Sequence, residues 1–202
     1  MILICIFLFV IAMLHALSTF VKLVKHSHSC EFIAFLSIFT AIVAISRIFF
    51  CAIPCIKPAL VLIILISITF SKEFALLIGC ASCFISNFIL GQGIWTLYQM
   101  VCFGYLGFFY ALLFDKLKIP KNRITISLLG FLFSIFFSLS INCFSYYLFS
   151  KNISINSFLI YCSASLFFDL LNAFFTEVFL LISYEKISKT LLRIKCKIKS
   201  KL

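Results

Sequence analysis

The chain has 202 residues, 64% of them hydrophobic, and a formal net charge of +11. This composition excludes an ordinary soluble domain, and the length suffices for one membrane domain of roughly six or seven helices at about 20 residues per span. The basic residues lie mainly between apolar segments and near the C-terminus, which favours contact with anionic lipid and argues against nucleic acid as a partner.

The apolar residues form seven consecutive segments, which run over residues 2–21, 32–53, 58–70, 74–90, 94–114, 124–149 and 155–184. Backbone groups in hydrocarbon must be hydrogen-bonded within their own segment, so each segment is predicted to be a helix of an all-α integral membrane protein. The third and fourth segments are short for a span, so tilted, interrupted or extended helices are expected there. The first segment has no Lys or Arg before its long apolar run, which favours a retained transmembrane helix over a signal peptide.

The Lys and Arg residues predict how the helices are oriented. If the C-terminus is cytoplasmic and the sides alternate back toward residue 1, the inner side holds 14 of the 17 Lys and Arg residues. The outer side then keeps Arg47, Lys57 and Lys151. This asymmetry follows the positive-inside rule. It predicts a multi-pass protein of the cell (plasma) membrane with its N-terminus outside and its C-terminus in the cytoplasm.

An uncharged polar stretch between the fourth and fifth segments contains the only tryptophan of the chain, Trp95. The orientation above places this stretch on the outer side, which argues against a role facing cytoplasmic ATP. A tight turn with an aromatic anchor at the membrane interface would also account for Trp95. It would not account for the amides Asn87, Gln92 and Gln99, which together with Thr96 are typical of a small-molecule pocket.

The last segment carries two acidic residues, Asp169 and Glu177, and the amide of Asn172. Polar residues at membrane depth are costly and are candidates for function by default. Asp169 and Asn172 would therefore contribute to a polar pocket. Two alternatives stay open, namely that Asp169 pairs with Arg47 purely for folding, or that Asp169 and Glu177 relay protons in a stand-alone secondary carrier.

Small residues recur at helical spacing in the second segment, at Ser37, Thr40, Ala41 and Ala44. Spacings of four between small residues let helix backbones approach closely in lipid. This face would serve either packing within the bundle or docking of a partner membrane subunit.

No catalytic or metal-binding signature is present in the sequence. The chain has no HExxH, no GxSxG and no phosphate-binding glycine loop, so neither an enzyme nor an ATP site is expected. His26 and His28 lie near Cys30 without the spacing of a zinc site, so no metal is expected. Cys51 and Cys55 could form a disulfide, which no other feature supports.

Several motifs in the first half of the chain together resemble a known family. They are SRI at 46–48 followed by Pro54, IKP at 56–58, NFILGQGIWTLYQM at 87–100 and GYLG at 104–107. The stretch 31–115 looks like the substrate-binding membrane subunits, or S components, of energy-coupling factor (ECF) vitamin transporters. The subgroup that it resembles looks like predicted cobalamin carriers.

The resemblance implies a six-helix S-component-like bundle, here residues 31–184, which binds a vitamin-like molecule, with cobalamin as the leading candidate, in a pocket open to the outside. Residues 1–30 would add an N-terminal transmembrane helix and a basic inner loop, and 185–202 a basic cytoplasmic tail. The bundle would dock on a transmembrane coupling subunit and two cytoplasmic ATPases. No permanently bound cofactor is implied, and ATP would be used only by the partner subunits. A non-binding structural subunit is a further alternative.

The expected site residues come from the outer polar groups, the last segment and the second segment. The predicted pocket consists of Arg47, Asn87, Gln92, Trp95, Thr96, Gln99, Asn142, Tyr146, Asp169 and Asn172. The predicted docking face consists of Ser37, Thr40, Ala41 and Ala44.

Overall fold

The computed structural model describes residues 2–26, 30–150 and 153–199, and over these ranges the chain forms seven helices and no strands. The helices are α1 (Ile2–His26), α2 (Cys30–Phe49), α3 (Pro58–Thr69), α4 (Lys72–Leu90), α5 (Ile94–Leu117), α6 (Arg123–Phe149) and α7 (Ile155–Lys199). Each lies on one of the predicted apolar segments, which confirms the all-α integral membrane bundle. Of the described residues, α4 to α7 are long and apolar enough to cross a membrane, and those of α1 to α3 form shorter apolar helices.

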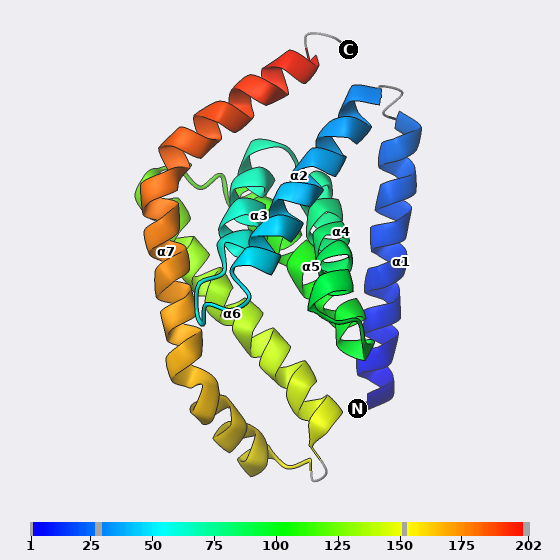
Figure 1. Cartoon of the computed structure of the whole chain (residues 1–202), viewed down its shortest axis with the longest axis vertical. Helices are drawn as coiled ribbons and strands as arrows, with labels where there is room; N and C mark the ends of the chain where they lie inside the picture. The colour runs from blue at the N-terminus through cyan, green and yellow to red at the C-terminus, as the bar shows by residue number, and fades with distance from the viewer. Residues whose placement is uncertain (1, 27–29, 151–152, 200–202) are drawn as a thin grey trace.

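The helices run up and down between two ends of the molecule (Figure 1). The N-terminus, the α4–α5 turn and the α6–α7 connection lie at one end. The α3–α4 turn, the α5–α6 connection and the C-terminus lie at the other. The connections between helices therefore alternate between the two ends, as the charge pattern of the sequence predicted. Which end faces the cytoplasm stays a prediction.

The short helix α3 lies in the middle of the bundle, between α2, α4, α5 and α7. Residues Leu60 to Ile66 of this helix are almost all buried and form the centre of the hydrophobic core. A helix enclosed by protein need not span the bilayer by itself, which explains its length of 12 residues. Its last carbonyls still need hydrogen-bond donors.

Two lysines supply those donors at the end of α3. Lys195 of α7 donates to the Thr69 and Phe70 carbonyl oxygens, the latter at 3.2 Å, and Lys121 donates to the Ile68 carbonyl at 3.2 Å. Positive charge at a helix C-terminus also complements the helix dipole. The basic C-terminal part of α7 therefore caps the central helix.

We expect Lys195→Met to lower the stability of the protein by about 1–2 kcal/mol, because it leaves carbonyl groups of α3 without a charged donor. The matched control is Lys189→Met, since Lys189 is exposed on the same helix. Thermal unfolding of both variants in detergent measures the effect. Equal melting temperatures for the two variants would contradict the capping role.

Helices α4 and α5 pack closely because glycines face one another across their interface. A methyl group at Gly79 would lie 2.5 Å from the Phe103 carbonyl oxygen and 2.7 Å from the Gly104 Cα. One at Gly104 would lie 2.8 Å from the Leu76 carbonyl oxygen. Both positions thus require glycine for backbone contact between helices, as is common in membrane bundles.

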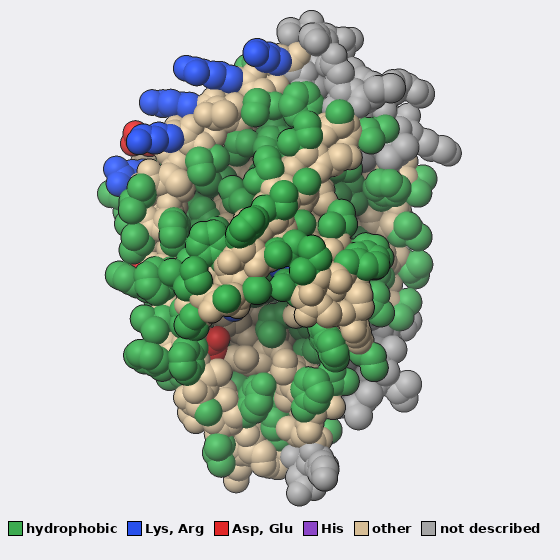
Figure 2. Space-filling model, viewed as in Figure 1, with side chains coloured by type: hydrophobic (Ala, Val, Ile, Leu, Met, Phe, Trp, Pro, Cys, Tyr) green, Lys and Arg blue, Asp and Glu red, His purple; other side chains and the backbone are tan. Residues whose placement is uncertain are grey.

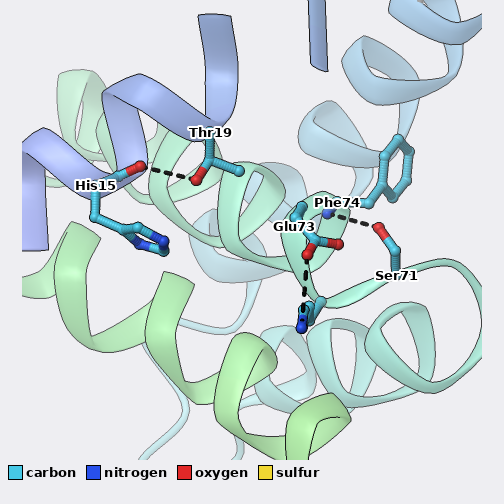
Figure 3. Close-up of polar contacts among 6 residues, drawn as sticks. His15, Thr19, Ser71, Glu73 and Phe74 are labelled. Atoms are coloured by element: carbon cyan, nitrogen blue, oxygen red, sulfur yellow. Dashed lines mark hydrogen bonds and ion pairs between the residues drawn. The ribbon is translucent and has the colours of Figure 1, made fainter. Parts of the chain in front are cut away.

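Helix α1 lies along the outside of α4 and α5 and makes fewer contacts than the other helices. The Tyr105 hydroxyl of α5 links to it twice, since it lies 2.8 Å from His15 Nδ1 and donates to the Ala12 carbonyl at 3.1 Å, while the Thr19 hydroxyl donates to the His15 carbonyl. Figure 3 shows His15 and Thr19 on α1 and, nearby, the start of α4, where Ser71 accepts a hydrogen bond from the Phe74 amide. Ser71 therefore caps α4 in the usual way.

Helix α7 continues without interruption through residue 184, where the sequence predicted the core to end. Beyond that point Ile187, Leu191 and Ile194 pack against the core, whereas Lys186 and Arg193 are exposed. Figure 2 shows basic side chains gathered along this part of α7. The predicted tail is thus an amphipathic continuation of the last helix.

The predicted docking face on α2 divides into two parts. Ser37 and Ala41 are exposed, together with neighbouring isoleucines. Thr40 and Ala44 are 4% and 2% exposed, because this side of α2 faces the bundle. Only Ser37 and Ala41 are therefore accessible to a partner in this conformation.

Candidate functional site

The structure contains a cavity of about 290 Å³ beneath the connection between α2 and α3. Its wall consists of Ser46, Arg47, Phe50, Cys51, Ile53, Pro54, Cys55, Ile56, Lys57, Pro58, Ala59, Leu90, Gln99, Phe103, Phe137 and Ile141. The connection supplies one side, and α4, α5 and α6 supply the other. Figure 2 shows basic and acidic side-chain atoms inside a hollow below α2. The cavity therefore combines aromatic walls with a few charged and polar groups, as ligand pockets do.

Arg47 is the polar centre of this cavity. Its guanidinium donates to the Ser86 hydroxyl at 2.6 Å, to Asn87 Oδ1 at 3.3 Å and to Gln99 Oε1 at 3.4 Å. The same group lies 4.5 Å from the centre of the Phe103 ring, which is a cation–π contact. These contacts fix the planar guanidinium at the junction of α2, α4 and α5.

The amide of Asn87 joins the predicted residues on α4 and α5. Its Nδ2 donates to the Thr96 hydroxyl and to Gln99 Oε1, both at 3.0 Å. Thr96 also accepts a hydrogen bond from the Gly93 amide at 3.2 Å, which holds the first turn of α5. The structure thus brings Arg47, Asn87, Thr96 and Gln99 into one hydrogen-bonded cluster, of which Arg47 and Gln99 reach the cavity.

Gln92 and Trp95 lie outside this cluster. The Gln92 amide donates to the Phe84 carbonyl at 3.1 Å, and the Trp95 indole donates to the Gly91 carbonyl at 3.4 Å. Neither residue lines the cavity, and Trp95 is 40% exposed. Gly91 has φ 107°, a left-handed conformation that side chains rarely adopt. The turn itself is therefore held by its own hydrogen bonds.

A second cation, Lys57, lines the cavity at the start of α3. Lys57 keeps an exposed surface, yet the surrounding protein displaces enough water to lower its pKa from 10.5. The Asp169 carboxylate opposes this effect, and the positive charge of Arg47 adds to it. From the sequence, Lys57 was expected on the outer side with no role in the pocket.

Asp169 is held by α6 and α7 rather than by an arginine. Its Oδ2 accepts hydrogen bonds from the Asn142 amide at 2.7 Å and the Ser165 hydroxyl at 2.9 Å. The structure does not form the alternative pair of Asp169 with Arg47, since Arg47 donates to neutral groups of α4 and α5. An ion pair joins Lys72 and Glu73 at 3.9 Å, away from this site.

The remaining predicted residues lie along the contact between α6 and α7. The Tyr146 hydroxyl donates to the Ser154 carbonyl at 2.9 Å and so fixes the connection between the two helices. Asn172 is 1% exposed and donates to Ser134 at 3.2 Å and to Ser138 at 3.4 Å. Such bonds join membrane helices to one another. None of these residues lines the cavity.

The cavity also uses residues that the sequence did not identify. Phe103 and Phe137 are buried in its wall, and Phe50, Cys51 and Cys55 come from the α2–α3 connection. Both cysteines are free thiols. Cys55 has φ 64°, which is uncommon for a residue with a side chain. The prolines that flank this connection were the only local signal of an ordered loop.

Comparison with known proteins assigns the chain to a class. A family model described as "ECF-type riboflavin transporter, S component" matches residues 27–189. The chain belongs to this family of ECF transporter S components, which are substrate-binding transporter subunits. The match does not extend to the cobalamin subgroup that the motifs resemble. Searches of curated proteins and of solved structures found no match.

Proposed function

We propose that this protein captures a vitamin of about the size of riboflavin in the cavity beneath the α2–α3 connection. The observation that carries the proposal is the cluster of Arg47, Asn87 and Gln99, which presents fixed polar groups at one side of an aromatic-walled cavity. Aromatic walls would hold a flat ring system, and the polar cluster would select its hydrogen-bonding edge.

The size of the cavity favours one vitamin class over another. A volume of about 290 Å³ lies at the lower end of the range for small-molecule sites, which begins at roughly 300 Å³. Cobalamin, with its corrin ring and nucleotide loop, is several times larger than a flavin. The riboflavin description of the matching family agrees with the smaller ligand. Cobalamin is therefore the less favoured substrate in this proposal.

Transport of the captured vitamin across the membrane would need partner subunits, as membership of the family implies. The end that carries Arg47 and Lys57 would face outside, and the basic end would face the cytoplasm. A transmembrane coupling subunit would dock on the exposed Ser37–Ala41 side of α2, and two ATPases would supply the energy. The carboxylate of Asp169 accepts hydrogen bonds from Asn142 and Ser165, which supports a structural role over a proton relay.

A pair of glutamine variants tests the site. We expect Gln99→Ala to weaken binding of the vitamin by roughly tenfold, because Gln99 lines the cavity and organises Asn87 and Arg47. The matched control is Gln92→Ala, since its amide donates to the Phe84 carbonyl of α4 and Gln92 does not line the cavity. Isothermal titration of the purified variants with riboflavin and a panel of other vitamins measures both. Loss of affinity in Gln92→Ala with unchanged affinity in Gln99→Ala would place the site elsewhere.

A further inference from the structure

Two of the three cations expected on the outer side of the membrane line the same small cavity. Arg47 comes from the end of α2 and Lys57 from the start of α3, and both belong to the cavity wall. The third cation, Lys151, lies outside the described residues. Arg47 and Lys57 therefore bring two positive charges to one cavity.

The groups that contact Arg47 leave its charge uncompensated. Ser86, Asn87 and Gln99 are neutral, and so is the Phe103 ring beneath the guanidinium. Charged groups at membrane depth normally pair with an opposite charge. Here, within the described part of the chain, no carboxylate lies within 4.0 Å of Arg47 or Lys57.

One acid, Asp169, acts electrostatically on Lys57. It does so from α7, but its carboxylate already accepts hydrogen bonds from Asn142 and Ser165, and it is not part of the cavity wall. Two cations and one carboxylate leave the site with a net charge of +1. The surrounding low dielectric strengthens the attraction of that charge for an anion.

We propose that the ligand carries an oxyanion, a carboxylate or a phosphate, which binds between Arg47 and Lys57 while its apolar or ring portion lies against Phe103 and Phe137. This inference rests on the proposed function, since it names the chemistry of the molecule captured at that site. Arg47 suits this role because a guanidinium stays charged, and its hydrogen bonds to Ser86, Asn87 and Gln99 hold that charge at the cavity wall. A neutral vitamin would leave one positive charge in the cavity without an anionic partner.

Matched neutral and anionic ligands test the inference on the purified full-length chain in lipid nanodiscs. For phosphate, the pair is riboflavin and riboflavin 5′-phosphate; for carboxylate, the pairs are panthenol and pantothenate, and biotinamide and biotin. One of these pairs should bind to the protein. Within that pair, we expect the affinity for the anionic member to be roughly 10- to 100-fold higher than the affinity for the neutral member. Which pair responds distinguishes phosphate from carboxylate.

Variants at Lys57 show whether the cavity charge causes that preference. Lys57→Met should reduce the ratio of the two affinities to near one, whereas the exposed Lys186→Met should keep the ratio of the unmodified protein. Melting temperatures without ligand show that both variants fold. A neutral member that binds as tightly as its anionic partner would overturn this inference alone. The absence of binding by every member would overturn the inference and the proposed function together.

Discussion

Replacement of Arg47 by methionine should lower the affinity for the captured vitamin by roughly 30- to 100-fold, the largest loss that we expect at any single position of the cavity. The guanidinium contacts Ser86, Asn87 and Gln99 at once, so its removal takes away a charged donor and disorganises the cluster on α4 and α5. Binding titrations on the purified protein measure the loss.

Two controls separate this effect from misfolding. Arg47→Lys retains the charge without the planar fork, so it should bind with an affinity between those of the unmodified protein and Arg47→Met. Arg123→Met removes an exposed arginine at the other end of the bundle and should leave affinity unchanged. An affinity for Arg47→Met within about twofold of the unmodified protein would refute the role of Arg47.

Substitution of Gly79 by alanine should be the most destabilising small change in the bundle, at about 1–3 kcal/mol. The new methyl group would lie 2.5 Å from the Phe103 carbonyl oxygen, so α4 and α5 would have to separate. Their separation would also displace Asn87 from Thr96 and Gln99, and ligand affinity should fall with stability. Thermal unfolding and binding titrations of the same variant measure both effects.

Gly130→Ala is the matched control for this prediction. At Gly130 the nearest atom to the new methyl group is the end of the Leu180 side chain, which can move, and not a backbone atom. Both substitutions bring the same gain in helix propensity, about 1 kcal/mol. A Gly79→Ala variant as stable as Gly130→Ala would show that the α4–α5 contact is looser than the structure indicates.

Hydrophobic segments and turn residues predicted the fold well. All seven helices lie where the apolar runs placed them, because the bilayer forces an apolar segment to satisfy its backbone internally. The short third segment had no explanation from sequence. Its reason is tertiary, since α3 is enclosed by other helices and its carbonyls are capped by Lys121 and Lys195, the latter 126 residues away.

The candidate site was only partly predictable. Arg47, Asn87, Thr96 and Gln99 were identified because polar groups stand out in an apolar chain, and the structure joins them. Gln92 stood out for the same reason, yet its amide donates to the Phe84 carbonyl of α4 and so fastens the turn to that helix. Composition cannot tell a polar group that faces a cavity from one that closes a turn.

The aromatic residues of the cavity wall could not be identified from the sequence. Phe103 and Phe137 are two phenylalanines among 28, so nothing in the sequence separates them from those that face lipid. Their position depends on how α5 and α6 meet the α2–α3 connection. Lys57 was visible as an outer cation, but only the fold shows that it shares a cavity with Arg47.

The most direct test of the account is the identity and amount of the small molecule that co-purifies with the protein. The chain is purified from cells in mild detergent, and the bound molecule is extracted and identified by mass spectrometry. Arg47→Met is processed in parallel. We expect one vitamin-sized molecule per chain in the unmodified protein and little or none in the variant. Equal occupancy in both proteins, or no bound vitamin under any supplementation of the growth medium, would contradict a vitamin site at Arg47.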